Sequence, residues 1–159
     1  MYKLDCSGST PIYQAEELLN NITILIEKAH DKNVPVVYIQ HSNPGALAFG
    51  SEDWQIHPNL HLTDNDLLIH KKQGNSFEGT SLEELLDSKS INSIVVTGLV
   101  THGCVKATCV GALELGYQVV LVGDGHSSYS KDAPDLIIKW NQNLREMGAK
   151  IRNTPEIDF

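Results

Sequence analysis

The sequence has few cysteines, no excess of basic residues and no long apolar run, and each shortage argues against a class of protein. Three cysteines at no metal-like spacing disfavour a disulfide scaffold and fit a protein of the reducing cytoplasm. With 12 basic against 20 acidic residues and a formal net charge of −8, nucleic acid and anionic membranes are unexpected partners. No apolar stretch approaches the roughly 18 residues of a membrane span, and we expect no signal peptide.

One domain is expected over residues 1–159, because the sequence shows no repeat, low-complexity tract or linker. From Pro11 onward, segments with apolar residues at helical spacing alternate with short β-branched runs. The predicted helices cover residues 15–30, 81–86, 104–115 and 133–147, and the predicted strands cover residues 34–40, 66–70, 91–96, 117–122 and 150–152. This alternation predicts a three-layer α/β/α sandwich around a mainly parallel sheet.

Particular residues set the predicted ends of these elements. Thr80-Ser81-Leu82-Glu83 is predicted to form a capping box that starts the second helix. Gly98 is expected to end the third strand and Gly123 the fourth, while Gly116 and Gly148 are expected just past the ends of two helices.

Cys104 is predicted to lie where a buried strand meets the N-terminus of a helix. Helical N–H groups and the helix dipole stabilise an anion there, so a thiolate at Cys104 is a candidate nucleophile. The alternative is a buried cysteine chosen for packing, which is the interpretation we favour for Cys109. Lys71 follows another strand, and ligands of parallel sheets bind at the carboxyl ends of the strands. We therefore expect Lys71 and Cys104 to converge.

The segment Val96-Thr97-Gly98-Leu99-Val100-Thr101-His102-Gly103-Cys104-Val105 resembles the nucleophile segment of the isochorismatase-like cysteine hydrolases, a family that includes nicotinamidases and N-carbamoylsarcosine amidases. The resemblance extends from about Pro11 to the C-terminus. It implies a Rossmann-like fold and a cysteine that attacks an amide-like carbonyl and forms an acyl-enzyme.

The resemblance also implies roles for residues around the cysteine. His70-Lys71-Lys72-Gln73-Gly74-Asn75-Ser76-Phe77-Glu78-Gly79-Thr80 is similar to the family's lysine segment, with Lys71 at the matching position, where its ammonium would stabilise the thiolate. By the same resemblance the oxyanion hole consists of the backbone N–H groups of Val100 and Cys104, after a cis bond between Leu99 and Val100.

One family element has no clear counterpart. The family places an aspartate at the end of a first strand, as proton acceptor and donor for the cysteine, but only ten residues precede Pro11 and they lack the usual apolar run. Asp5 is the candidate for this acid, or else an ordinary surface residue. The first strand is accordingly expected to be short or missing, with a stub from residues 1–4, another segment or chain, or a truncated sequence as the alternatives.

The remaining polar candidates lie in the predicted loops. Asp53, His57 and His61 resemble a nicotinamidase metal site only in part, because their spacing differs, so no metal or other cofactor is expected. Trp54 and Phe77 are candidates for the substrate pocket or the core, and His102 for a contact to substrate or a solvent-facing turn. His126 is expected to be structural or at the rim.

Two functions remain open on the sequence. The first is a cofactor-free amidohydrolase that acts on a small amide or carbamoyl compound in the cytoplasm. The second is a catalytically silent relative, serving as a binding or assembly subunit, that lacks the acid. Isochorismate hydrolysis is a weaker enzymatic alternative. A homo-oligomer is expected, and Leu47 and Phe49 are candidates for its contact.

Overall fold

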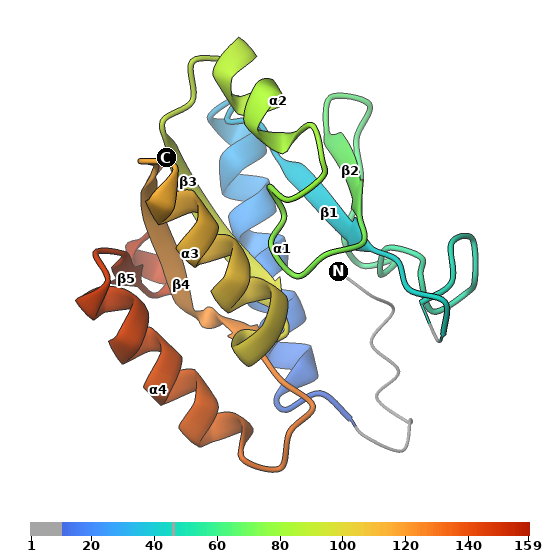
Figure 1. The fold of residues 1–159 in the computed structure, drawn as a ribbon, viewed down its shortest axis with the longest axis vertical. Coiled ribbons are helices and arrows are strands. Elements are labelled where there is room, and N and C mark those ends of the chain that lie inside the picture. Colours follow the sequence, from blue (N-terminus) through green and yellow to red (C-terminus); the bar gives the residue numbers. More distant parts are fainter. Residues whose placement is uncertain (1–10, 46) are drawn as a thin grey trace.

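The structure is a computed structural model that describes residues 11–45 and 47–159. Helices and strands alternate along the chain, except that β2 follows β1 with no helix between them (Figure 1). They are α1 (Ala15–Asp31), β1 (Val37–His41), β2 (Leu67–Lys71), α2 (Leu82–Ser88), β3 (Ser93–Leu99), a π-helical turn (Thr101–Val105), α3 (Lys106–Glu114), β4 (Gln118–Ser127), α4 (Ala133–Glu146), β5 (Lys150–Arg152) and a 3-10 helix (Thr154–Glu156).

Every strand pair is parallel, as predicted, but the sheet is divided into two parts. β1 pairs with β2, and β3, β4 and β5 form a second sheet in that order. Among the described residues no strand connects β1 with β3. Residues 1–4, the candidate stub of the family's first strand, lie outside the described residues, so the expectation that this strand is short or missing stays a prediction.

Helices cover both faces of the three-stranded sheet, so the chain forms three layers (Figure 1). Alternate residues of β4 face the two layers. Leu121 belongs to a core cluster with Cys109 of α3 and Leu144 of α4, while Val122 packs with Leu25 of α1. This alternation follows from the two-residue period of a strand and explains why β4 is apolar on both faces.

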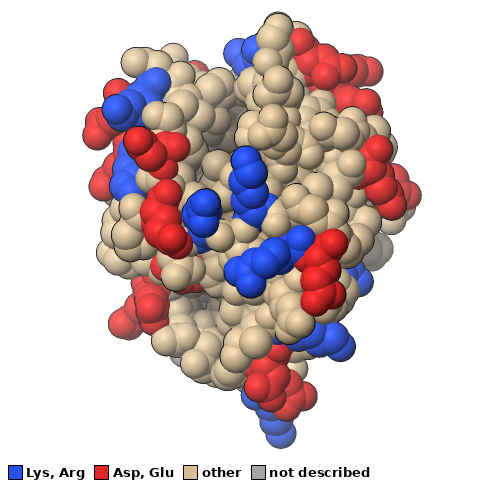
Figure 2. All heavy atoms as spheres, turned by 90° about the vertical axis from the view of Figure 1, so that its left-hand side faces the viewer, with Lys and Arg blue, Asp and Glu red and all other residues tan. Residues whose placement is uncertain are grey.

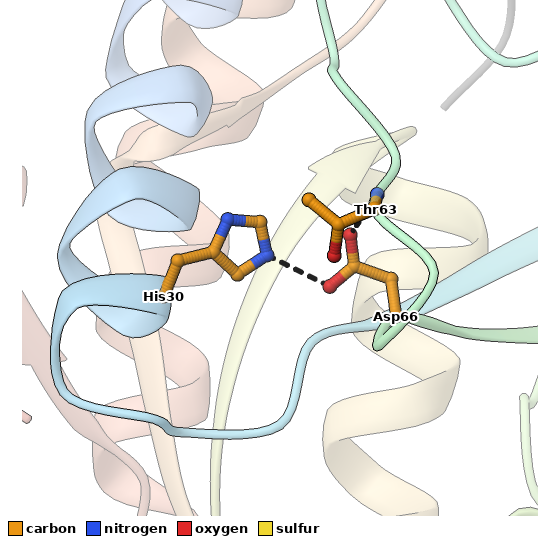
Figure 3. Close-up of polar contacts among 3 residues, drawn as sticks. All are labelled: His30, Thr63 and Asp66. Atoms are coloured by element: carbon orange, nitrogen blue, oxygen red, sulfur yellow. Dashed lines mark hydrogen bonds and ion pairs between the residues drawn. The ribbon is translucent and has the colours of Figure 1, made fainter.

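The helix α1 also holds the two sheets together. Leu18, Leu19 and Ile22 pack with Tyr38 of β1, and burying such aliphatic side chains stabilises the fold by roughly 1.5–3 kcal/mol each. At the other end of the helix, His30 Nε2 lies 2.8 Å from Asp66 Oδ1, just before β2 (Figure 3). The side chain of Asp66 is only 2% exposed, and its second oxygen accepts a hydrogen bond from Thr63 N.

Two strands are longer than predicted. β3 continues through Gly98 to Leu99, and β4 continues past Gly123 to Ser127. Gly98 has φ +116° and lies at a shift in register between β3 and β4, so it produces an irregularity instead of a strand end. This extension brings His126 beside Gly98 and Ser127 beside Leu99.

Two helix starts differ from the predictions, whereas α1 and α4 begin at Ala15 and Ala133 as predicted. α2 begins at Leu82 without the predicted capping box: its N-cap is Ser81, which makes no side-chain cap, and Thr80 Oγ1 accepts the hydrogen bond from Leu82 N. α3 begins at Lys106, because the chain first forms the turn Thr101–Val105. Gly116 and Gly148 follow α3 and α4 with φ of +87° and +109°, as predicted for helix ends.

The surface that carries α4 and β5 has side chains of both charges. Figure 2 shows basic side chains near the middle of this face and acidic ones mainly toward its edges, with no broad patch of one sign. Over the residues described, no helix combines the length and the apolar character that crossing a bilayer requires.

Candidate functional site

A cavity of about 200 Å³ lies between the two sheets. Its walls are Val37 and Ile39 of β1 on one side and Val95 and Leu99 of β3 on the other. Lys71, Ser76, Cys104 and Thr108 also line it. The division of the sheet thus creates an apolar space that reaches both predicted reactive side chains.

Lys71 is the last residue of β2 and is only 5% exposed. Its ammonium donates a hydrogen bond to the backbone carbonyl of Gly74. Burial lowers the pKa of Lys71 below its usual 10.5, while the charge of Cys104 and a hydrogen bond to it act in the opposite direction. The structure therefore brings Lys71 and Cys104 to the same cavity, close enough for Cys104 to affect the pKa of Lys71, from segments 33 residues apart in the sequence.

Cys104 belongs to the turn Thr101–Val105 and is partly exposed. Gly103 before it has φ −113° and ψ −108°, outside the helical region, and a Cβ there would lie 2.9 Å from Val100 Cγ2. A glycine is therefore suited to this position. Cys109, one turn inside α3, is fully buried, and burial raises the pKa of its thiol to about 12, which agrees with a packing role.

The predicted oxyanion segment has the expected backbone. The peptide bond between Leu99 and Val100 is cis. The Val100 carbonyl accepts hydrogen bonds from Gly103 N (3.0 Å) and Val105 N (3.3 Å), so the chain folds back over this residue. The role of the Val100 and Cys104 N–H groups in binding an oxyanion remains a prediction.

Three other predicted site residues, Trp54, Phe77 and His102, are not among the residues that line this cavity. Trp54 is buried, donates from Nε1 to Ser42 Oγ at 2.8 Å and packs on Phe49, and Phe77 stacks on Tyr117 in the core. Phe77 belongs to a core cluster, whereas Trp54 belongs to none, and a role of either in binding substrate stays a prediction.

His102 faces the end of β4 instead of the cavity. Its Nδ1 lies 3.2 Å from Ser128 Oγ, and its ring meets Tyr129 edge-on. Its side chain is partly exposed, so it lies neither wholly in solvent nor among the residues that line the cavity.

None of the described residues that line the cavity is acidic, so none of them supplies a catalytic carboxylate. Asp5 lies outside the described residues. Within residues 11–45 and 47–159, no three His, Cys, Asp or Glu side chains come together as metal ligands, so Asp53, His57 and His61 form no such cluster.

Two histidines, His126 and His41, have buried ring nitrogens near the site, which the sequence did not predict. His126 is 2% exposed and forms hydrogen bonds with both ring nitrogens. His41 ends β1 beside Lys71, and its buried Nδ1 has no partner among the described residues. Burial, and then the charge of Lys71, lower the pKa of His41. Only the register of β1 with β2 and the extension of β4 could have revealed these positions.

Known proteins resemble this chain along most of its length. Streptothricin hydrolase of Streptomyces noursei is 32% identical over 133 residues, which cover 82% of this chain but 48% of the relative. N-carbamoylsarcosine amidase of Arthrobacter is 28% identical over 79% of this chain and 54% of the relative. The chain thus spans about half the length of these two proteins.

Solved structures show the same fold. An isochorismatase from Pseudomonas putida KT2440 superposes with a TM-score of 0.90 at 22% identity, covering 98% of this chain and 85% of that one. N-carbamoylsarcosine amidase from Thermoplasma acidophilum gives a TM-score of 0.79 at 22% identity, covering 91% and 87%. Residues 6–156 match the family profile described as the Isochorismatase domain. The chain belongs to the isochorismatase family.

Proposed function

We propose that this protein hydrolyses a C–N bond in a small amide or carbamoyl compound, with Cys104 as the nucleophile. The observation that carries the proposal is that Cys104 and the buried Lys71 line the same cavity and interact electrostatically. A buried positive charge next to a thiol favours the thiolate, which is the attacking form. Relatives named as a streptothricin hydrolase and an N-carbamoylsarcosine amidase support an amide-like substrate.

The reaction would proceed in two steps. The sulfur of Cys104 bonds to the carbonyl carbon, and the Val100 and Cys104 N–H groups hold the resulting oxyanion. The C–N bond then breaks as the leaving nitrogen takes up a proton, which leaves a thioester. A water molecule attacks the thioester, releases the carboxylic or carbamic acid and restores the thiol. We assign the proton transfers to Asp5, and no metal or other cofactor takes part in this scheme.

The setting we propose is a cytoplasmic homo-oligomer whose partner is the small substrate, with no role for nucleic acid or a membrane. Phe49 is 71% exposed and packs on Trp54, and it is our candidate for the contact between subunits. Gel filtration coupled to light scattering measures the oligomeric state. A monomer for both the parent and Phe49→Ser would contradict this part of the proposal.

A second candidate is a catalytically silent binding subunit of the same family. The divided sheet favours it, because the described lining of the cavity offers no carboxylate that would exchange protons with Cys104. Such a protein would retain Lys71 and Cys104 and bind a small molecule without turning it over.

The rate of alkylation of Cys104 separates a reactive thiolate from an ordinary thiol. Cys6, the third cysteine of the sequence, is replaced by serine so that only Cys104 and Cys109 remain. Iodoacetamide is then applied near pH 7, and the modified peptides are quantified by mass spectrometry. We expect Cys104 to react about tenfold or more faster than a free thiol, and the buried Cys109 to stay unmodified. A rate no higher than that of a free thiol would overturn the nucleophile assignment.

Turnover is tested on a panel of small amides and carbamoyl compounds with release of ammonia or amine as the readout. Hydrolysis that disappears in Cys104→Ala supports the hydrolase. A reactive Cys104 with binding but no turnover of the panel would instead favour the binding subunit.

A further inference from the structure

A chain of buried hydrogen bonds connects the turn that carries Cys104 to α4. Thr101 begins this turn and is fully buried, and its Oγ1 lies 2.9 Å from His126 Nδ1. On the other side of the ring, His126 Nε2 lies 2.9 Å from Asn141 Oδ1. Three elements, the turn, β4 and α4, thus meet at one imidazole that is 2% exposed.

The partners determine which ring nitrogen carries the proton. Asn141 Nδ2 donates to the carbonyl of Gly123 at 3.2 Å, so Asn141 Oδ1 is the acceptor and His126 Nε2 is the donor. Since the neutral ring has a single N–H, Nδ1 is an acceptor and takes its hydrogen bond from the hydroxyl of Thr101. Burial lowers the pKa of His126, and Asn141 and Asp124 oppose this, so the ring stays neutral at pH 7.

The two residues after His126 make further contacts, one with the turn of Cys104 and one with Tyr13, which precedes α1. Ser128 Oγ lies 3.2 Å from His102 Nδ1, and Ser127 Oγ donates to the carbonyl of Tyr13. The His126 backbone is paired with β3 at Gly98, three residues before Thr101. The imidazole therefore lies where small movements of β4 would be passed to the turn.

We propose that His126 is a positioning residue: in its neutral form with a proton on Nε2, it connects Thr101 to Asn141 and so keeps Cys104 against Lys71. This inference rests on the proposed function, since it explains how the nucleophile is held in place. It assigns to His126 no contact with substrate. Its consequence is that the hydroxyl of Thr101 affects the reactivity of a sulfur three residues away.

Three threonine variants test the inference, each in the Cys6→Ser background. Thr101→Val keeps the shape but removes the hydroxyl, and Thr101→Ser retains it. Thr154→Val is the matched control, because Thr154 is a 3% exposed threonine whose hydroxyl donates to Asp124 Oδ1 and does not contact the turn. The readouts are the rate of Cys104 alkylation by iodoacetamide at pH 7 and the melting temperature.

We expect Thr101→Val to react about tenfold more slowly at Cys104, close to the rate of a free thiol, because a displaced Cys104 loses the stabilisation of its thiolate by Lys71. Thr101→Ser should recover most of the parental rate. Thr154→Val should melt earlier than the parent and react at the parental rate. Parental reactivity in a folded Thr101→Val, or an equal loss in Thr154→Val, would overturn the positioning role.

A measurement on the unsubstituted protein covers the case in which Thr101→Val does not fold. The ¹⁵N chemical shifts of histidine rings distinguish the two neutral tautomers and the imidazolium. We expect the signal of His126, assigned by its loss in His126→Gln, to show a proton on Nε2 alone at pH 7. A proton on Nδ1 would refute the inference. Neither readout uses a substrate, so failure to hydrolyse any amide would count against the proposed function alone.

Discussion

Replacing Lys71 by methionine should make the fold more stable and the thiol of Cys104 less reactive. The ammonium of Lys71 is 5% exposed, and burial lowers its pKa. Burying a charge carries a desolvation penalty, and an apolar side chain of similar length carries none. The substitution therefore separates what Lys71 does for Cys104 from what it does for stability.

The expected magnitude follows from two opposing contributions. Replacing buried charged groups by apolar residues of similar volume ranges from neutral to stabilising by about 1–4 kcal/mol. Against this, the carbonyl of Gly74 loses its hydrogen bond from Lys71, at a cost of about 1 kcal/mol or somewhat more. The two contributions together change the free energy of unfolding by about −1 to +3 kcal/mol, mostly a gain, and raise the melting temperature by up to roughly 9 °C.

The gain in the free energy of unfolding from Lys71→Met should become smaller as the pH rises. Between the lowered pKa of Lys71 and 10.5, the unfolded wild-type chain binds more protons than the folded one. The stability of the wild type therefore rises with pH in this window relative to the variant, which has nothing to titrate. The difference between the two should shrink as the pH approaches 10.5.

Urea unfolding at pH 7 and pH 10 measures stability, and iodoacetamide alkylation measures the reactivity of Cys104. Lys72→Met is the control, because Lys72 is the exposed neighbour, and it should change neither quantity appreciably. The reasoning fails if Lys71→Met is less stable than the wild type by more than about 1 kcal/mol, or if its Cys104 reacts at the wild-type rate.

Two further substitutions test other parts of the structure. Burial acts to raise the pKa of Asp66, but hydrogen bonds from Thr63 and His30 outweigh it and hold that pKa below 3.8. Asp66→Asn should cost about 1 kcal/mol near pH 7, and urea unfolding should show this difference begin to shrink as the pH falls below about 4; a difference that grows as the pH is lowered would contradict the assignment. Gly111→Ala would place a Cβ 2.3 Å from Asn75 Nδ2. Although alanine is favoured over glycine in helices by about 1 kcal/mol, overpacking costs about 1–3 kcal/mol, so we expect no gain in urea unfolding, and a more stable variant would show that Asn75 moves freely.

Local patterns determined the elements of this fold. Apolar spacing identified α1 and α4, and glycines that tolerate positive φ identified the ends of α3 and α4. The same local reasoning failed where neighbouring strands decided the outcome. Gly98 and Gly123 look like strand breakers, yet β3 continues through Gly98, which is paired with His126 of β4, and β4 resumes its pairing with β3 at His126 after an irregular stretch that includes Gly123.

The sequence by itself therefore determined an alternating parallel α/β fold and, through a family resemblance, the choice of Lys71 and Cys104 as candidate site residues. Only the tertiary structure decided that these two residues line one cavity, that the sheet is divided around this cavity, and that the side chain of His126 lies beside Thr101 in the turn of Cys104. The physical reason is that such contacts join residues far apart in the chain. They depend on how helices and strands pack, which no local pattern of residues encodes.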